Sequence, residues 1–370
     1  MTGGLRIVAV SGTYPPDVGG AELSLHHMLV HLSRKGHEIV VVADERNQTR
    51  RVEGIRVLHA RPSRLERVLD SVARSLRPSV AFAQMAYARE ALCWAATRGL
   101  PSVLFLRTAS HGTFLGGAGE PVPDIVVANS ESVREAVGAR WRGECMVVNP
   151  FVRQPRNSSP AAIRDMITFV NPVVSKGADR VRQLAISLPM QRFLVVRSWT
   201  GFRDKEGWSP VLWNRLARSQ GLRDIQAPEE VFFGDLSNVE VMEATNDMDR
   251  LVYGRSRIVL CPSRIEPFGR VAVEALVRGI PVIASDIGGL AEALRGGGIL
   301  IRDGDDIGAW VKAIDLLENE ETYRAWKRAA LEAGRRHDSV TSVSVFMGRL
   351  GELLSSRKLD SKGLRGVHWS

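Results

Sequence analysis

The rest of the chain is organised around the segment Ser263-Arg-Ile-Glu-Pro-Phe-Gly-Arg-Val-Ala-Val-Glu-Ala-Leu-Val-Arg-Gly279. The apolar run 257–262 precedes it and the run 279–284 follows it, and both have the composition of buried parallel strands. Pro267 is a typical first residue of a helix, and Gly279 is a typical stop. The stretch therefore predicts a strand–helix–strand unit whose helix begins at Pro267.

Two glutamates belong to this unit. Glu266 lies at the predicted helix entrance, and Glu274 lies roughly 12 Å further along the axis at about 1.5 Å per residue. Parallel α/β sheets bind ligands at the carboxyl ends of their strands, which is where Glu266 falls. The free N–H groups of residues 268–270 at the helix start favour an anion such as phosphate. We therefore expect a polar, phosphate-bearing ligand at this edge.

The composition is that of a globular protein with room for two domains. Of 370 residues, 44% are hydrophobic and 25% are charged. No apolar run reaches the ~18–20 residues of a membrane span, and the apolar run 5–10 is too short for a signal sequence. The three cysteines lie in apolar surroundings without metal-ligand spacing, so we expect reduced core thiols in a cytoplasmic protein.

The net charge of +9 leaves two interpretations. No block of Lys and Arg interleaved with aromatic residues indicates a nucleic-acid partner. An arginine-rich proteome together with an anionic small ligand accounts for the charge, and peripheral contact with an anionic membrane at its inner face is the alternative. The predicted helix 65–76 leaves the same choice, because its apolar face, flanked by arginines, either joins the core or lies on a membrane surface.

The N-terminal segment is predicted to form a βαβ unit with paired glycines at its turn. The runs 5–10 and 38–43 have the pattern of buried strands, and the segment 21–34 has apolar residues at helical spacing. Gly19 and Gly20 precede this helix, and without Cβ atoms they let backbone approach a phosphate or a sugar. The signal is weak alone, since the turn is neither a GxGxxG nor a Walker motif.

Strand and helix patterns alternate along the rest of the chain, which predicts parallel, doubly wound sheets. The further strands are predicted at 55–60, 79–82, 102–106, 125–128, 145–148, 166–170, 192–196, 231–233, 258–261, 281–284 and 299–301. The further helices are predicted at 65–76, 88–97, 131–137, 178–186, 289–294, 307–317, 321–333 and 340–354.

The polar segment 149–160, with three prolines, is typical of a hinge between two such units. We predict an N-terminal Rossmann-like domain at 1–155 and a second Rossmann-like domain at 156–338. The remainder, 339–370, is predicted to form a helix that packs back on the first domain and a mobile tail from 358. Two such domains place the carboxyl edges of their sheets face to face across a central cleft.

The loop after the predicted strand 102–106 contains His111, the histidine best placed for chemistry. The loop lies at the same sheet edge as Gly19 and Gly20. Histidine titrates near neutral pH, so His111 is a candidate general acid or base, and an exposed loop histidine is the alternative. Structural or surface roles are expected for the histidines on or just after the first helix, which are His26, His27, His31 and His37.

The candidate residues on the two sides of this cleft suit a nucleoside-diphosphate sugar. Cations and N–H groups neutralise a diphosphate, and carboxylates accept hydrogen bonds from vicinal hydroxyls. A ligand with a diphosphate in its middle and a polyol at each end matches that inventory.

Three motifs make the chain resemble the retaining GT-B glycosyltransferases of the family 4 type, the glycosyl transferases group 1. The first is the opening 14–43, with Tyr-Pro-Pro-Asp-Val-Gly-Gly-Ala-Glu at its start. The second is Lys176-Gly177, which is similar to the phosphate loop of the family's second domain. The third is the segment 262–292, in which the two glutamates have the E-x7-E spacing. The resemblance covers nearly the whole chain and is weakest at 48–123.

The resemblance implies a GT-B fold, a nucleoside-diphosphate-sugar donor, and a role for each matching residue. Glu274 would hold the ribose hydroxyls, Glu266 would contact the donor sugar near the reacting carbon, and Lys176 would neutralise the diphosphate. The other donor-binding candidates are Gly19, Gly20, Arg197, Phe268, Gly269, Arg270 and Val271. The family needs neither a metal nor another cofactor, since amides and basic side chains stabilise the developing charge.

One position departs from the family pattern. Family members usually have an arginine five positions before the loop lysine, and this chain has Asn171 there. Asparagine lacks the charge-assisted fork that arginine offers a phosphate. Arg270 is our first candidate for a replacement cation, and Arg197 is the second.

The leading hypothesis is a retaining, metal-independent glycosyltransferase that moves a sugar to an acceptor hydroxyl. One alternative is a nucleotide-sugar epimerase of the same architecture, which needs two acid/base groups flanking one sugar carbon. The other is a non-catalytic nucleotide-sugar-binding subunit. The acceptor is expected to be a glycan, a lipid-linked molecule or a small molecule, and the segment 48–123 is expected to select it.

Overall fold

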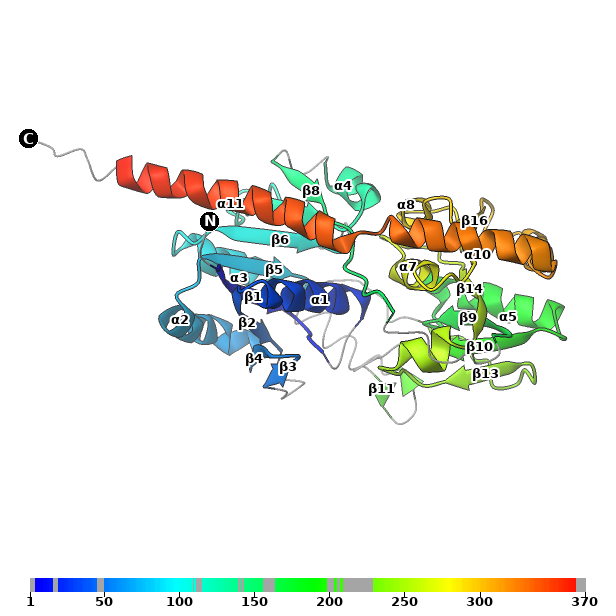
Figure 1. The fold of residues 1–370 in the computed structure, drawn as a ribbon. Coiled ribbons are helices and arrows are strands. Elements are labelled where there is room, and N and C mark those ends of the chain that lie inside the picture. The colour runs from blue at the N-terminus through cyan, green and yellow to red at the C-terminus, as the bar shows by residue number, and fades with distance from the viewer. Residues whose placement is uncertain are drawn as a thin grey trace, which may run out of the picture.

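Two α/β lobes make up the computed structural model (Figure 1). It describes residues 4–15, 19–44, 50–108, 110, 115–138, 141, 143–155, 164–197, 203–204, 207–208 and 229–363. The first lobe contains the N-terminal sheet and the second lobe contains the sheet that follows the 149–160 segment. A separate antiparallel pair joins β11 (Arg203–Asp204) and β12 (Gly207–Trp208).

The sheet of the first lobe has the strand order β3-β4-β2-β1-β5-β6-β7-β8. Its strands are β1 (Arg6–Ser11), β2 (Glu38–Ala43), β3 (Arg51–Val52), β4 (Ile55–His59), β5 (Val80–Gln84), β6 (Ser102–Leu106), β7 (Ile125–Ala128) and β8 (Cys145–Val147). All neighbours are parallel except the short β3, which pairs antiparallel with β4. The strand order changes direction at β1, which is a usual place for a ligand site.

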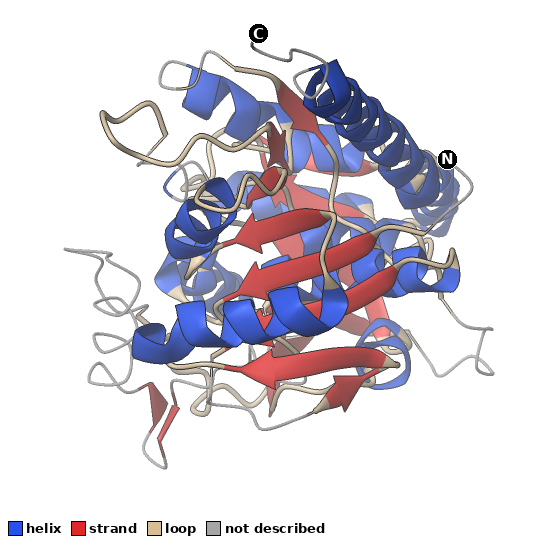
Figure 2. Ribbon diagram, turned by 90° about the vertical axis from the view of Figure 1, so that its left-hand side faces the viewer, coloured by secondary structure: helices blue, strands red, loops and turns tan. Residues whose placement is uncertain are grey.

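Helices cover both faces of this sheet (Figure 2) because its strands are apolar on both sides. They are α1 (Gly20–Arg34), α2 (Leu65–Leu76), α3 (Ala88–Ala96), α4 (Glu131–Gly138) and α11 (Ser339–Gly363). α1 and α11 pack against the face that contains Ile7 and Val41. The other three pack against the opposite face, which contains Val8 and Val42.

The apolar face of α2 belongs to the core and not to a free surface. Its Leu65, Leu69, Val72 and Leu76 are at most 4% exposed. The arginines at 61, 64, 67, 74 and 77 are exposed, as expected for a solvated face. Within the described part of the chain, no helix is long and apolar enough to cross a membrane.

The sheet of the second lobe is parallel throughout, in the order β13-β10-β9-β14-β15-β16. Its strands are β9 (Met166–Val170), β10 (Arg192–Val196), β13 (Val239–Met242), β14 (Ser256–Cys261), β15 (Val282–Ser285) and β16 (Gly298–Ile301). The helices α5 (Ala178–Ser187) and α9 (Ile307–Leu316) cover one face. The helices α7 (Arg270–Leu276), α8 (Leu290–Leu294) and α10 (Glu320–Arg335) cover the other. The order changes direction at β9, whose neighbours are β10 and β14.

Two predictions for this lobe are wrong. Residues 231–233 form no strand, because Phe233 is buried as a loop residue in the core and the edge strand is β13. The central helix begins at Arg270 and not at Pro267. Its N-cap, Gly269, has φ 104°, and a Cβ there would lie 2.6 Å from Leu290 Cδ2. α7 is therefore only seven residues long, and Glu266 lies on the loop before it.

α10 and α11 lead the chain from the second lobe back to the first (Figure 1). Val343, Phe346, Leu350 and Leu354 of α11 are at most 7% exposed and belong to the core of the first lobe. The helix continues to Gly363, so residues 358–363, which we predicted to be part of a mobile tail, are helical.

Candidate functional site

A cavity of about 660 Å³ lies between the two lobes, a size typical of small-molecule sites. The first lobe contributes Gly19, Gly20, Leu23 and His27, all at the start of α1 or within it. The linker contributes Val152, Arg153 and Gln154. The rest of the lining comes from the strand ends, loops and helices at the carboxyl edge of the second sheet.

Lys176 and Glu266 meet at this edge although 90 positions separate them. They follow β9 and β14, which are hydrogen-bonded neighbours at the point where the strand order changes direction. Lys176 Nζ lies 2.7 Å from Glu266 Oε2. The hydroxyl of Ser263 donates to the same carboxylate oxygen at 3.2 Å. The side chains are 28% and 16% exposed, so this ion pair is open to a ligand in the cavity.

Glu274 is held by two donors on the cavity wall. Arg270 Nε donates to its Oε1 at 2.6 Å, one helical turn away on α7. The hydroxyl of Tyr253 donates to its Oε2, also at 2.6 Å. Burial and the charge of Glu274 raise the pKa of Tyr253, so this hydroxyl keeps its proton. The carboxylate is thereby fixed in one orientation toward the cavity.

Arg278 closes the wall beyond Glu274. Its Nε donates to Asp249 Oδ1 at 2.6 Å, and its guanidinium lies 4.6 Å from the centre of the Tyr253 ring. Asp249 and Tyr253 are the first and last residues of a single π-helical turn, η4 (Asp249–Tyr253). This turn therefore supplies a carboxylate and an aromatic ring to one side of the cavity.

Arg270 connects the two lobes. Its Nη1 donates to the carbonyl of Phe151 in the linker at 3.1 Å, and its Nη2 lies 3.3 Å from His27 Nδ1 on α1. Burial and the charge of Arg270 lower the pKa of His27 to about 3, so the ring is neutral and Nδ1 accepts this bond. Gly20 belongs to the same junction, because a Cβ there would lie 3.3 Å from Arg270 Cδ.

The backbone conformation at position 171, which departs from the family pattern, explains why an asparagine is found there. Asn171 has φ 72°, a left-handed conformation in which asparagine is enriched among residues with a side chain. Arg197, the second candidate for a replacement cation, lies near Asn171 in the cavity wall. Its Nε is 3.2 Å from Glu230 Oε1 and its Nη1 is 2.5 Å from Glu243 Oε1.

The structure brings most of the predicted donor-site residues together. The cavity is lined by Gly19, Gly20, Lys176, Arg197, Glu266, Arg270, Val271 and Glu274. Phe268 is 2% exposed and packs in a small core with Val152 and Val273, and neither it nor Gly269 lines the cavity. His111 lies outside the described residues.

Sequence reasoning missed His27, Asp249, Tyr253 and Arg278 as cavity residues. His27 follows Gly20 and Leu23 at i, i+3 and i+7, which places all three on one helical face. Arg278 follows Arg270 and Glu274 at i+8 and i+4, although the helix has ended before it. These spacings could have indicated His27 and Arg278 from the sequence. Asp249 and Tyr253 had none, because a π-helical turn has no recognisable pattern at this length.

Each of the cations named so far in the described cavity wall has a carboxylate partner. The pairs are Arg153 with Glu53, Lys176 with Glu266, Arg197 with Glu230 and Glu243, Arg270 with Glu274, and Arg278 with Asp249. Among the residues that the structure describes, no three His, Cys, Asp or Glu side chains gather as metal ligands would. A phosphate would therefore meet cations that are already paired, and it would have to displace a carboxylate from at least one.

Comparison with protein families finds one match. Residues 236–333 match the model "Glycosyl transferases group 1", and this segment includes Glu266 and Glu274. D-inositol 3-phosphate glycosyltransferase of Mycobacterium sp. strain KMS is 45% identical over 83 residues, 22% of this chain and 18% of the relative. The enzyme of the same name from Mycolicibacterium smegmatis is 36% identical over 194 residues, 51% of this chain and 41% of the relative. The chain therefore matches less than half the length of these relatives.

Solved structures match nearly the whole chain at low identity. Sucrose-phosphate synthase from Thermosynechococcus elongatus superposes with a TM-score of 0.71 at 15% identity, covering 95% of this chain and 99% of that one. HepE from Anabaena, in complex with UDP and glucose, has a TM-score of 0.70 at 19% identity, with coverage of 94% and 99%. The chain therefore has the GT-B fold. The resemblance to the glycosyl transferases group 1 is confirmed for residues 236–333.

Proposed function

We propose that this chain, whose fold is GT-B and whose second lobe matches the glycosyl transferases group 1, transfers a sugar from a nucleoside-diphosphate donor to an acceptor hydroxyl. Transfer would proceed with retention of configuration and without a metal. The observation that carries the proposal is that Lys176, Glu266 and Glu274 lie in one cavity between the lobes.

The chemistry of these groups suits the parts of such a donor. Glu274, held by Arg270 and Tyr253, presents a fixed carboxylate to the two hydroxyls of a ribose. Lys176 offers its ammonium to the diphosphate. Glu266, on the adjacent loop, lies beside Lys176 and so near the sugar that the diphosphate carries.

The Lys176–Glu266 ion pair explains how one ligand would bind at a site whose named cations already have carboxylate partners. A diphosphate competes with Glu266 for the ammonium, and a sugar hydroxyl offers the released carboxylate a new donor. The donor molecule carries both groups, so its binding replaces both halves of the pair. A free nucleoside diphosphate replaces one half alone.

Chemistry in this cleft would depend on charge and on the exclusion of water. The leaving diphosphate gains negative charge as the sugar–oxygen bond breaks, and the ammonium of Lys176 stabilises that charge without a metal. Closure of the lobes about the linker removes water that would otherwise hydrolyse the donor.

The relatives indicate which compounds to test first. The Anabaena structure contains UDP and glucose, which supports UDP-glucose as the first donor. The curated relatives are named as D-inositol 3-phosphate glycosyltransferases, which supports a polyol phosphate as the first acceptor.

The test is a binding and transfer experiment. Stabilisation of the protein by UDP, ADP or GDP, undiminished by a chelator, is expected in a thermal-shift assay. Radiolabelled UDP-glucose and inositol phosphate are then expected to give a product with the anomeric configuration of the donor. Isomerisation of the donor would support an epimerase, and binding without turnover would support a non-catalytic subunit.

Glu266→Ala is expected to lower transfer by about 10²–10³-fold while the melting temperature is kept, because the carboxylate faces the reacting sugar. Glu332→Ala is the matched control, since Glu332 pairs with Arg335 at the end of α10 and with Arg336 just after it. Transfer by Glu266→Ala at the rate of this control would remove Glu266 from the reaction.

A further inference from the structure

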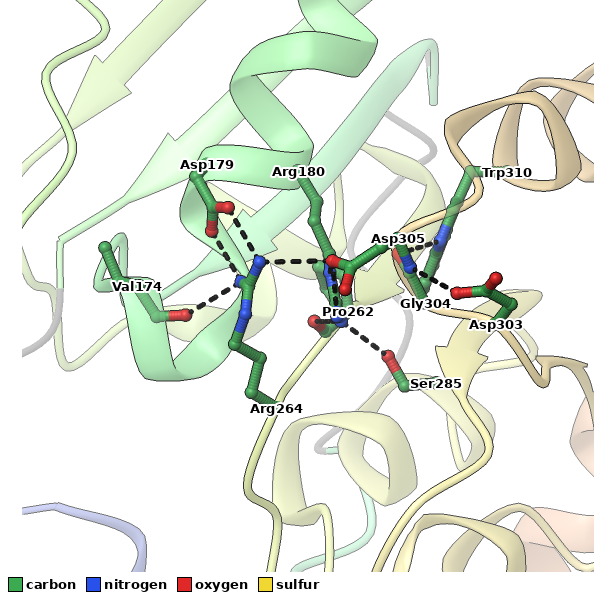
Figure 3. Close-up of polar contacts among 10 residues, drawn as sticks. All are labelled: Val174, Asp179, Arg180, Pro262, Arg264, Ser285, Asp303, Gly304, Asp305 and Trp310. Carbon is green, nitrogen blue, oxygen red and sulfur yellow. Dashed lines mark hydrogen bonds and ion pairs between the residues drawn. The ribbon is translucent and has the colours of Figure 1, made fainter.

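The loops that carry Lys176 and Glu266 are tied together by two arginines that reach in opposite directions (Figure 3). Arg180 extends from α5, behind the Lys176 loop, to the start of the Glu266 loop. Arg264 extends from the Glu266 loop to the start of α5. The helix that follows the Lys176 loop and the Glu266 loop each supply one arginine that binds the other.

Arg180 is buried at the carboxyl edge of the second sheet. Its side chain is 8% exposed, and its Nη1 donates to the carbonyl of Pro262 at 2.8 Å. The same nitrogen lies 3.4 Å from Ser285 Oγ at the end of β15, and Nε donates to Asp305 Oδ1 at 3.0 Å. Gly304 leaves room for the guanidinium, since a Cβ there would lie 2.5 Å from Nη1. The group thus holds the residue from which the Glu266 loop departs.

Arg264 completes the connection from the other side. It makes a two-pronged bond to Asp179 in the first turn of α5, at 2.7 and 2.9 Å. It also donates to the carbonyl of Val174 at 3.3 Å and shares Asp305 with Arg180. Its backbone N–H donates to Ser175 O at 2.9 Å.

The close approach of the two loops leaves no space for adjustment. Gly177 has φ 80°, and a Cβ on it would lie 2.0 Å from the carbonyl oxygen of Pro262, the one that Arg180 binds. A buried cation is costly unless it is fully hydrogen-bonded, and an apolar side chain of similar size often serves a core as well. Packing alone therefore does not account for an arginine at position 180.

We propose that Arg180 and Arg264 are positioning residues that hold Lys176 at the distance from Glu266 that the donor diphosphate and its sugar require. The inference rests on the proposed function. It assigns neither arginine a contact with the ligand, because both act through the loops that carry Lys176 and Glu266.

The experiment measures the dissociation constants of UDP, ADP and GDP by isothermal titration calorimetry. For a nucleotide that the wild-type protein binds, Arg180→Met is expected to lower the affinity about tenfold. Asp179→Asn removes the charge that Arg264 binds and is expected to lower the affinity about threefold. In a Lys176→Ala background the same substitutions are expected to change affinity less than twofold. A merely structural role would give the same factor in both backgrounds.

Arg182→Met is the matched control. Arg182 lies on the same helix and makes an equally two-pronged bond to Asp235, but neither residue lines the cavity. The Arg182→Met variant is expected to bind the nucleotide with the same affinity as the wild-type protein. If Arg180→Met binds as tightly as Arg182→Met, the positioning role is wrong and the proposed function is untouched. If wild type binds none of the three nucleotides, the proposed function fails and the inference with it.

Should Arg180→Met not fold, Asp179→Asn decides the question, because the Asp179 carboxylate is partly exposed and the asparagine side chain has the same shape. Unchanged affinity in Asp179→Asn would then overturn the inference. Weaker binding that disappears in the Lys176→Ala background would support it.

Discussion

The side chain of Arg270 connects the two lobes and also lines the cavity. Its three guanidinium nitrogens contact Glu274, the carbonyl of Phe151 and His27. Hydrogen bonds that involve a charged group each contribute about 1.5–3 kcal/mol. The side chain is 12% exposed, so solvent screens these contacts little. Its charge still faces the cavity, and it remains our first candidate to replace the arginine that is absent at position 171.

Lys176→Ala and Arg270→Ala are both expected to weaken nucleoside-diphosphate binding. Loss of the ammonium removes a charge-assisted bond to phosphate, which predicts a decrease of about tenfold or more in affinity. Arg270→Ala removes a positive charge and leaves Glu274 held by Tyr253 alone, so we expect a decrease of about three- to tenfold in affinity. Calorimetric titration with UDP measures both.

Arg182→Ala serves as the control for removal of a cation elsewhere on the second lobe. If Arg270→Ala binds as wild type while Lys176→Ala binds weakly, Arg270 does not replace the missing arginine.

Among the elements, α11 packs on the first lobe although it follows the second lobe in the sequence. It is the last helix in sequence, yet its apolar side chains complete the core beneath the first sheet. Phe346 is fully buried, and its ring lies 5.8 Å from that of Phe82 and 5.6 Å from that of Phe105. The first lobe therefore depends on a segment that the chain adds after the second lobe is complete.

Phe346→Ala is expected to destabilise the first lobe by about 3–5 kcal/mol, because it leaves a cavity in a packed aromatic cluster. Val345→Ala, one position away and 61% exposed, is the control and is expected to change stability by less than about 0.5 kcal/mol. Thermal unfolding followed by circular dichroism measures both. Equal melting temperatures would show that α11 does not support the first lobe.

At the scale of the molecule, polar contacts between described residues hold the lobes together beside the cavity. Glu292 of α8 accepts from Asn149 Nδ2 at 2.7 Å and from the backbone N–H of Glu131 at 2.8 Å. Ser130 Oγ donates to the carbonyl of Pro267 at 2.6 Å. A small apolar cluster that includes Val152 and Phe268 lies at the same junction. Such a contact permits the lobes to separate and close again.

Glu292→Ala is expected to favour the open arrangement, since it removes two bonds to a charged acceptor, each worth about 1.5–3 kcal/mol. Small-angle X-ray scattering is expected to give a larger radius of gyration than for wild type, and saturating UDP is expected to reduce the difference. Glu332→Ala on α10 is the control. An unchanged radius in Glu292→Ala would mean that other contacts set the closure.

Much of the fold was predictable because its signals are local. Buried strands appear as short apolar runs, and both β2 (Glu38–Ala43) and β9 (Met166–Val170) were predicted with the bounds that the structure has. The helix α2 was likewise predicted residue for residue. The start of α7 was not, because Pro267 favours a helix start but the close approach of Gly269 to Leu290 delays it.

From the amino-acid sequence one can place Lys176 and Glu266 near the carboxyl ends of strands, since each follows an apolar run. That their loops touch follows only from the fold, because adjacency depends on strand order and not on separation along the chain. The same holds for the partners of Arg270 and for the burial of Arg180. From the sequence a lysine or arginine is expected at the surface, because these residues are rarely buried. Only packing against neighbouring loops shows which of them are buried.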